Sequence, residues 1–365
     1  EITLNTSNDE IAVCNLGSIN IPNHLDSEGN LDKEKLEKNV TTAIRMLDNV
    51  IDINYYAVPQ AENSNFKHRP IGMGIMGFQD ALYIKKIPYA SEAAVDFADE
   101  SMELVSYMAI NASSDLAKER GSYSSYEGSL WSQGVLPLDS IEILEKQRGN
   151  QYIEVDKTTR LDWEALREKV KTQGMRNSNT MAIAPTATIA NITGLTQSIE
   201  PTYSNLFVKS NLSGEFTVIN MHLVDALKEI DMWDEVMVYD LKNLNGSLES
   251  IARVPEDIKK LFATSFEVEP KWLIEAASRR QKWIDQSQSL NLYVSEPNGK
   301  KLDVMYRMAW LRGLKTTYYL RSRSATTTEK STITNMELNA VKTEPKTYDQ
   351  PEACSIDDPD CEACQ

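Results

Sequence analysis

The sequence predicts an α/β fold, because short apolar segments alternate with longer segments whose apolar residues recur at helical spacing. Its 365 residues suffice for one large domain or two ordinary ones. A hydrophobic fraction of 41% is typical of a globular protein with a full core. Composition changes only after Ser324, so we predict one folded unit over residues 1–323 and a tail over residues 324–365.

The first half contains a strand candidate and two long helix candidates. The short apolar run Ile11-Ala-Val-Cys-Asn-Leu16 predicts a buried strand. Asp32 is a candidate N-cap for a helix that should stop before Pro59. A second helix is expected over residues 93–119, ended by Gly121.

The second half repeats the same alternation. Residues 180–193 are expected to run from a strand into a helix start, and residues 316–323 should form a short strand. Further helices are predicted over 163–172, 219–229, 270–284 and 302–312. From residue 324 to 360, Ser, Thr, Glu, Lys and Pro dominate, which favours a flexible tail.

Charge and cysteine usage exclude several classes of protein. A formal net charge of -16 argues against a nucleic-acid-binding surface, although a nucleotide needs only a local pocket. No apolar run approaches the roughly 20 residues that cross a bilayer. Three of the four cysteines lie in the last dozen residues, which fits a reducing cytoplasm better than a disulfide scaffold. The chain opens with Glu1 and not Met, so we expect it to begin inside a longer protein.

Two glycine-rich or hydroxyl-rich segments are candidate phosphate sites. Gly72-Met-Gly-Ile-Met-Gly77 matches a dinucleotide fingerprint, but Lys67-His-Arg-Pro70 stands where that fingerprint needs a strand, so close helix packing is favoured. At Pro185-Thr-Ala-Thr-Ile-Ala190, a predicted helix start exposes backbone N–H groups, and Thr186 or Thr188 adds a hydroxyl. This second segment is either a phosphate site or an ordinary helix cap.

The cysteines and a tyrosine pair each have a plain structural interpretation and a chemical one. Cys361-Glu-Ala-Cys364 lacks enough ligands for structural zinc even with Cys354, so an exchanging dithiol is favoured. Cys14 lies in an apolar run, and this local sequence taken alone favours an inert buried thiol. Tyr318-Tyr319 would ordinarily be two strand residues on opposite faces.

Taken together, the motifs resemble the large subunit of class I ribonucleotide reductases. Order and spacing are retained over about residues 1–323, which is far more specific than any single motif. The matching segments are Glu10-Ile-Ala-Val-Cys-Asn-Leu-Gly-Ser18, Ile51-Asp-Ile-Asn-Tyr-Tyr56, His68-Arg-Pro-Ile-Gly-Met-Gly74, Asp115-Leu-Ala-Lys-Glu119, Gly174-Met-Arg-Asn-Ser178, Ala184-Pro-Thr-Ala-Thr-Ile-Ala190, Ser198-Ile-Glu-Pro201, Leu212-Ser-Gly-Glu-Phe216, Ile284-Asp-Gln-Ser-Gln-Ser289 and Gly313-Leu-Lys-Thr-Thr-Tyr-Tyr-Leu-Arg321.

The resemblance implies a fold and a boundary. Residues 1–323 would be the C-terminal part of the family's barrel domain, that is, the second half of a ten-stranded α/β barrel with surrounding helices. Residues 324–365 would be a flexible redox tail. The family's radical cysteine precedes a glutamate that Glu1 resembles, so that cysteine and the effector sites for ATP and deoxynucleotides would lie upstream.

The resemblance also implies roles for individual residues. Glu1 resembles the general base near the ribose, and Cys14 resembles a thiol that reduces the substrate. Tyr318 and Tyr319 resemble the pair that relays radical equivalents, and Cys361 and Cys364 resemble the dithiol that reduces the internal disulfide. The substrate phosphate loop would comprise Pro185, Thr186, Ala187, Thr188 and Ile189.

The implied activity is the reduction of ribonucleoside diphosphates to deoxyribonucleotides for DNA synthesis. No cofactor or metal is expected on this chain, because a dinuclear-metal small subunit would supply the radical. The other expected partners are the N-terminal part of the large subunit and thioredoxin or glutaredoxin. Two alternatives stay open: a cobalamin-dependent class II reductase, against which the tyrosine pair argues, and a non-catalytic fragment that acts only in assembly.

Overall fold

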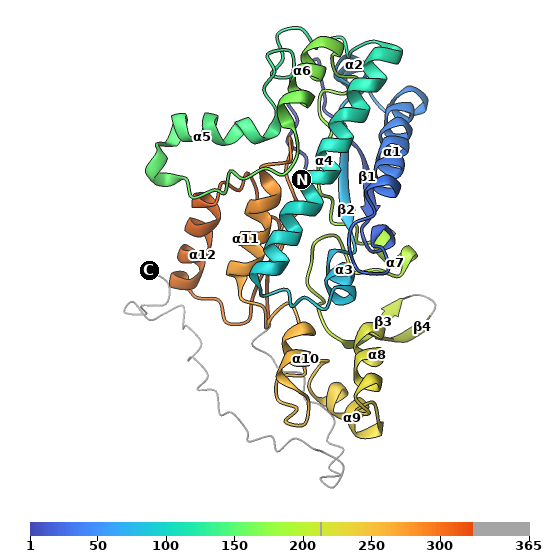
Figure 1. The fold of residues 1–365 in the computed structure, drawn as a ribbon, viewed down its shortest axis with the longest axis vertical. Helices are drawn as coiled ribbons and strands as arrows, with labels where there is room; N and C mark the ends of the chain where they lie inside the picture. The colour runs from blue at the N-terminus through green and yellow to red at the C-terminus, as the bar shows by residue number, and fades with distance from the viewer. Residues whose placement is uncertain (212–213, 324–365) are drawn as a thin grey trace, which may run out of the picture.

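The computed structural model describes residues 1–211 and 214–323 (Figure 1). In these ranges, one-turn 3-10 helices lie at Pro22–His24, Pro137–Asp139 and Asn150–Tyr152. The α-helices are α1 Lys33–Ile53, α2 Pro59–His68, α3 Phe78–Ile84, α4 Glu92–Arg120, α5 Ser140–Arg148, α6 Trp163–Gln173, α7 Ile189–Thr193, α8 Met221–Glu229, α9 Glu235–Asn243, α10 Glu256–Leu261, α11 Pro270–Gln281 and α12 Gly299–Leu311. The predicted α/β class is therefore confirmed at the level of mixed helices and strands.

Within the described residues, six strands pair two by two. They are β1 Asn15–Asn20, β2 Ile71–Met76, β3 Leu206–Asn211, β4 Gly214–Ile219, β5 Leu292–Val294 and β6 Leu320–Ser322. β1 pairs with β2 and β5 pairs with β6, both in parallel, whereas β3 and β4 form an antiparallel hairpin. Parallel pairs need a crossover between their strands, and α1 and α2 supply the first one.

Single parallel bridges join the two parallel pairs into one run of strands. Met73 of β2 bridges to Met181, and Ile183 bridges to Gln288, just before β5. In chain order the run is therefore β1, β2, residues 181–183, residues 288–294 and β6. Among the described residues this run stays open and does not close into a barrel.

The main hydrophobic core lies between this run and a layer of helices. α1 packs on β1 and on α4, and α4 also contacts α6 and α11. Figure 1 shows α4 running obliquely along the long axis of the molecule, with α1 beside its upper part and α11 beside its lower part. The core includes fully buried residues of α1, β2, α4 and α11, among them Ile44, Met73, Val105 and Ile274.

A second, smaller core gathers around α8, α9 and α10. Leu223, Met237 and Phe262 are buried there, and Tyr83 of α3 joins them. In Figure 1 these helices and the β3–β4 hairpin occupy one end of the molecule.

The helix ends follow the predicted local chemistry. The Asp32 side chain accepts a hydrogen bond from Lys35 N at 3.0 Å and so caps α1. Gly121 ends α4 with φ +85°, a conformation that disfavours any side chain. Pro59 does not merely stop the preceding pattern, because it is also the first residue of α2.

Two sequence interpretations are wrong in detail. The strand predicted at residues 11–16 begins only at Asn15, since Ile11 N–H bonds to Gln60 O and residues 11–14 form a loop. Two glycines of this segment, Gly72 and Gly74, serve close strand packing and not helix packing. Gly72 and Gly74 lie within β2, where an added Cβ at Gly74 would stand 2.6 Å from Ala182 O.

None of the helices in the two described ranges combines the length and apolar character that a membrane span requires.

Candidate active site

Cys14 lies directly before β1 and beside β2. Its sulfur accepts a hydrogen bond from Gln286 Nε2 at 3.5 Å. A Cβ atom added at Gly72 would lie 3.3 Å from this sulfur, so the bare glycine makes room for it. Burial raises the pKa of the Cys14 thiol to about 12, and the nearby Asp285 and Glu1 carboxylates add to the rise. At neutral pH the group is therefore a thiol, which suits hydrogen donation better than nucleophilic attack.

Glu1 is held by the segment that follows α11. Ser287 N–H donates to the backbone oxygen of Glu1 at 3.0 Å, and Ser289 Oγ donates to its carboxylate. The Glu1 charge contributes to the raised pKa of both Cys14 and Tyr318. Both groups must therefore lie within electrostatic reach of one carboxylate, as a shared site requires.

Tyr318 and Tyr319 form a contacting pair. Their ring centroids are 4.1 Å apart with an interplanar angle of 48°, and Tyr318 OH donates to Tyr319 OH at 3.3 Å. The expectation for neighbouring strand residues is two opposite faces, but β6 begins only at Leu320, so the rule does not apply. The hydrogen bond with Tyr319, with smaller contributions from burial and from Glu1, raises the pKa of Tyr318.

The predicted phosphate loop follows the strand-like residues 181–183. Thr188 is the N-cap of α7, as expected, but its side chain makes no capping bond and α7 has only five residues. So short a helix has little dipole, and the donors that matter are backbone N–H groups. In the described part of the chain, no hydrogen bond occupies the N–H groups of Ala187, Thr188 and Ile189.

The two threonines of this loop differ in what they can offer a ligand. Thr186 is buried, has φ +50°, and its hydroxyl accepts Ser198 N–H at 2.7 Å. Thr188 is exposed and makes no such bond. Of the two predicted hydroxyl donors, Thr188 is thus the one that faces outward from the loop.

The segment from Asp285 to Ser289 connects these groups, and sequence reasoning missed its role. Asp285 accepts the N–H groups of Thr180 and Met181 at 2.6 and 3.0 Å. Ser289 N–H bonds to Ile183 O, two residues before the loop. The signal was a run of polar residues, Asp285-Gln-Ser-Gln-Ser289, that follows the end of α11 after three residues and is largely buried. Buried polar side chains need partners, and those of Gln286 and Ser289 include Cys14 and Glu1.

The predicted cysteines of the tail, Cys354, Cys361 and Cys364, lie outside the described residues. Within the ranges that are described, no three His, Cys, Asp or Glu side chains gather as candidate metal ligands.

A second buried polar cluster lies against β5 and β6. Tyr293 of β5 donates its hydroxyl to Glu200 at 2.7 Å, and its backbone pairs with Arg321. Arg280 is fully buried with its guanidinium 4.2 Å from the Phe78 ring centroid. Burial raises the pKa of Glu200 to about 7, against which the Tyr293 hydrogen bond and the two arginines act.

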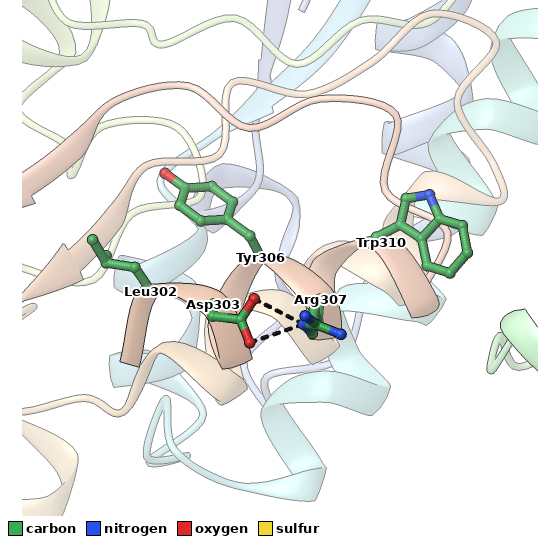
Figure 2. A pocket seen from close by; sticks show the side chains of 5 residues that line it. All are labelled: Leu302, Asp303, Tyr306, Arg307 and Trp310. Carbon is green, nitrogen blue, oxygen red and sulfur yellow. Dashed lines mark hydrogen bonds and ion pairs between the residues drawn. The ribbon is translucent and has the colours of Figure 1, made fainter. Parts of the chain in front are cut away.

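A shallow surface groove of about 450 Å³ lies along α12. Figure 2 shows its lining side chains on one helix, with Asp303 and Arg307 bonded to each other. They are Leu302, Asp303, Tyr306, Arg307 and Trp310. None of them contacts Cys14, Glu1 or the tyrosine pair through any interaction among the described residues, so the groove is separate from the candidate active site.

A family model matches most of the chain. The model described as "Ribonucleotide reductase, barrel domain" matches residues 1–320.

Curated relatives carry reductase names. The chain is 55% identical to the "Ribonucleoside-diphosphate reductase subunit alpha" of Chlamydia trachomatis over its whole length, which covers 36% of that protein. It is 40% identical over 93% of its length to the "Ribonucleoside-diphosphate reductase large subunit" of Danio rerio, covering 41% of that protein. The Caenorhabditis elegans large subunit is 38% identical over the whole chain, which covers 44% of it. The chain thus spans less than half the length of these relatives.

Proposed function

This chain belongs to the ribonucleotide reductase family through its barrel domain, and on that premise we propose that it is the C-terminal part of a catalytic large subunit of class I. The observation that carries the proposal is the gathering of Glu1, Cys14 and Tyr318 around residues 286–290. A general base, a neutral thiol and a radical relay are the groups that this reaction needs.

The proposed reaction replaces the 2′-hydroxyl of a ribonucleoside diphosphate by hydrogen. The 2′ C–O bond breaks and the hydroxyl leaves as water. Two thiols supply the two hydrogens and two electrons and end as a disulfide, so atoms and electrons balance. Cys14 is one of these thiols, and its raised pKa keeps the transferable hydrogen in place at neutral pH. The second thiol would come from the N-terminal part of the protein.

Glu1 and the tyrosines have distinct parts in this proposal. The Glu1 carboxylate accepts the 3′-hydroxyl proton while the substrate is a radical. Ser289 fixes that carboxylate, so the base need not reorient during the reaction. Tyr318 and Tyr319 exchange an electron and a proton across their 3.3 Å hydrogen bond and need no metal for it. The radical itself would come from a small subunit that carries a dinuclear metal centre.

The substrate's diphosphate would bind at residues 185–189. The unoccupied N–H groups of Ala187, Thr188 and Ile189 are suited to phosphate oxygens, and Thr188 adds an exposed hydroxyl. A structure with bound diphosphate tests this directly. A phosphate more than about 3.2 Å from every N–H of residues 186–190 would contradict it.

Other parts of the longer protein would complete the enzyme. The open run of parallel strands would be the second half of a ten-stranded barrel, closed by the N-terminal part. ATP and deoxynucleotide effectors would bind in that missing part. Cys361 and Cys364 would carry reducing equivalents from thioredoxin or glutaredoxin to the Cys14 disulfide, in the cytoplasm.

Reconstitution tests the proposed function. The chain alone should form no deoxynucleotide, whereas the chain joined to the N-terminal part should form it when the small subunit is added. Product formation that depends on adenosylcobalamin and not on the small subunit would indicate a class II enzyme. No product under either condition would leave only an assembly role.

A further inference from the structure

Gln286 is a fully buried amide at the centre of the site, and the proposed reaction gives it no part. Its Nε2 atom lies 3.0 Å from Ile71 O and 3.5 Å from the Cys14 sulfur. Its Oε1 atom lies 3.4 Å from Thr3 N. One side chain thus touches β2, the reducing cysteine and the segment that begins with Glu1.

The two outer contacts decide which end of the amide meets the sulfur. Thr3 N–H is a donor and requires the amide oxygen, whereas Ile71 O is an acceptor and requires the NH2 group. The orientation is therefore fixed by the network, and Cys14 meets an N–H group and not a carbonyl. A reversed amide would place two donors and two acceptors against each other inside the protein, at high cost.

The backbone that carries Gln286 is also restrained. Lys315 Nζ donates to the carbonyl oxygens of Ile284, Asp285 and Gln286 at 3.0, 2.8 and 2.8 Å. Gln286 N–H donates to Met181 O at 3.2 Å. The amide is thus presented from a rigid segment, as positioning of a reacting group requires.

The same segment holds the second reacting side chain. Ser287 and Ser289, one and three residues further on, bind the backbone oxygen and the carboxylate of Glu1. Any displacement of residues 286–289 would therefore move the cysteine and the carboxylate together.

We infer that Gln286 is a positioning residue for Cys14: its amide N–H holds the sulfur in register with the Glu1 carboxylate. The inference rests on the proposed reductase function. The N–H donor also stabilises a developing thiolate more than a thiol, which opposes the effect of burial. Loss of the donor should therefore displace the Cys14 sulfur and raise the pKa of its thiol.

Two substitutions at Gln286 separate positioning from packing. Gln286→Met keeps the length and volume of the side chain but removes the N–H groups. Gln286→Glu keeps the shape of the side chain. Its buried carboxyl can donate a hydrogen bond to Cys14, through its O–H group, only when it is protonated. Gln288 supplies the matched control, because it is equally buried two residues away and its Nε2 bonds to Ala277 O at 2.8 Å, without touching Cys14 or Glu1. Gln288→Met and Gln288→Glu therefore report the cost of altering a buried amide in this segment.

The first readout is deoxynucleotide formed in one turnover by the reconstituted enzyme. Gln286→Met should lose at least tenfold in rate while the dissociation constant of the nucleotide stays within twofold of wild type. Gln286→Glu should recover activity as pH falls from 8 to 6, and the wild type and both Gln288 variants should show no such recovery. If the Gln286 and Gln288 variants lose activity equally, with the same pH profile, Gln286 only fills space and the inference is overturned.

The second readout does not depend on catalysis. The rate of Cys14 alkylation by iodoacetamide at pH 8, followed by peptide mass spectrometry, tracks the thiolate fraction. Gln286→Met should slow it several-fold relative to wild type and Gln288→Met. An unchanged or faster rate would contradict the contact. If the wild-type enzyme makes no product and Gln286→Met still slows alkylation, the proposed function fails while the Gln286 contact is supported.

Discussion

The side chains of Glu1 and Cys14 are each held in position by few contacts, and a single substitution can remove each contact. Glu1 has its carboxylate fixed by one hydroxyl, that of Ser289. Cys14 has its sulfur bounded by Gly72 and bonded by Gln286. Hydrogen bonds to charged groups contribute about 1.5–3 kcal/mol, so one hydroxyl suffices to set the position of a base.

Replacing Ser289 by Ala should lower the turnover number of the reconstituted enzyme about tenfold, with little change in KM. The reason is that the Glu1 carboxylate loses its partner but the phosphate loop is untouched. Steady-state kinetics measure the split. Ser287→Ala is the control, since its hydroxyl bonds to Gln281 and Thr316 and its backbone N–H still holds Glu1. A Ser289→Ala enzyme no slower than the control would show that the hydroxyl does not orient the base.

At the scale of elements, the strands bring the site together because they are parallel and closely spaced. Gly72 lies in β2, and a Cβ there would stand 2.6 Å from Leu16 Cδ2 and 2.9 Å from Ala182 Cβ. Glycine is needed at this position for space and not for backbone conformation. The close approach is what lets Cys14, at the edge of β1, reach Gln286.

Gly72→Ala should therefore destabilise the protein by about 1–3 kcal/mol and reduce activity further by pushing on Cys14. Gly299→Ala is the matched control, because nothing lies within 4 Å of its added Cβ at the start of α12. Chemical denaturation of both variants gives the difference in unfolding free energy. If Gly72→Ala and Gly299→Ala have equal unfolding free energies, β1 and residues 181–183 move apart without loss of stability. That result would refute the tight packing at Gly72.

The helices that were predicted match α1, α4, α6, α8, α11 and α12 to within a few residues, because their signals are local. The shorter helices α2, α3, α5, α9 and α10 were not predicted. Asp32 and Gly121 mark ends by their own backbone chemistry, and both predictions are confirmed. The strand at Asn15–Asn20 was displaced in the prediction, because its residues are mostly half-buried and mix polar with apolar side chains, which leaves no alternating pattern. The roles of Gln286 and Ser289 could not be predicted, since their partners Cys14 and Glu1 lie more than 270 residues away in the chain.

At the scale of the whole molecule, a buried acid couples stability to pH. Glu200 has a pKa of about 7, raised chiefly by burial from an ordinary value of 4.5. Between these two values the unfolded chain releases a proton that the folded chain retains. The stability of the protein should therefore fall as pH rises from about 4.5 to 7, by about 3 kcal/mol from this group.

Glu200→Gln should remove that loss, because the amide does not ionise and its oxygen still accepts the Tyr293 hydroxyl. Unfolding free energies should be measured at several pH values. The free energy of the variant minus that of the wild type should increase from pH 4.5 to 7 and stay constant above pH 7. Glu296→Gln, at an exposed glutamate, should show no such trend. Parallel curves for Glu200→Gln and the wild type would mean that Glu200 ionises normally.

The central claim is that Glu1, Cys14 and the tyrosine pair form one radical active site. The most direct measurement is deoxynucleotide production by the reconstituted enzyme carrying Tyr318→Phe or Tyr319→Phe, with nucleotide binding measured beside it. Phenylalanine keeps the ring and removes the phenolic proton, so we predict loss of turnover in both variants with binding within about twofold of wild type, a difference of less than 1 kcal/mol. Normal turnover in both variants would contradict the account.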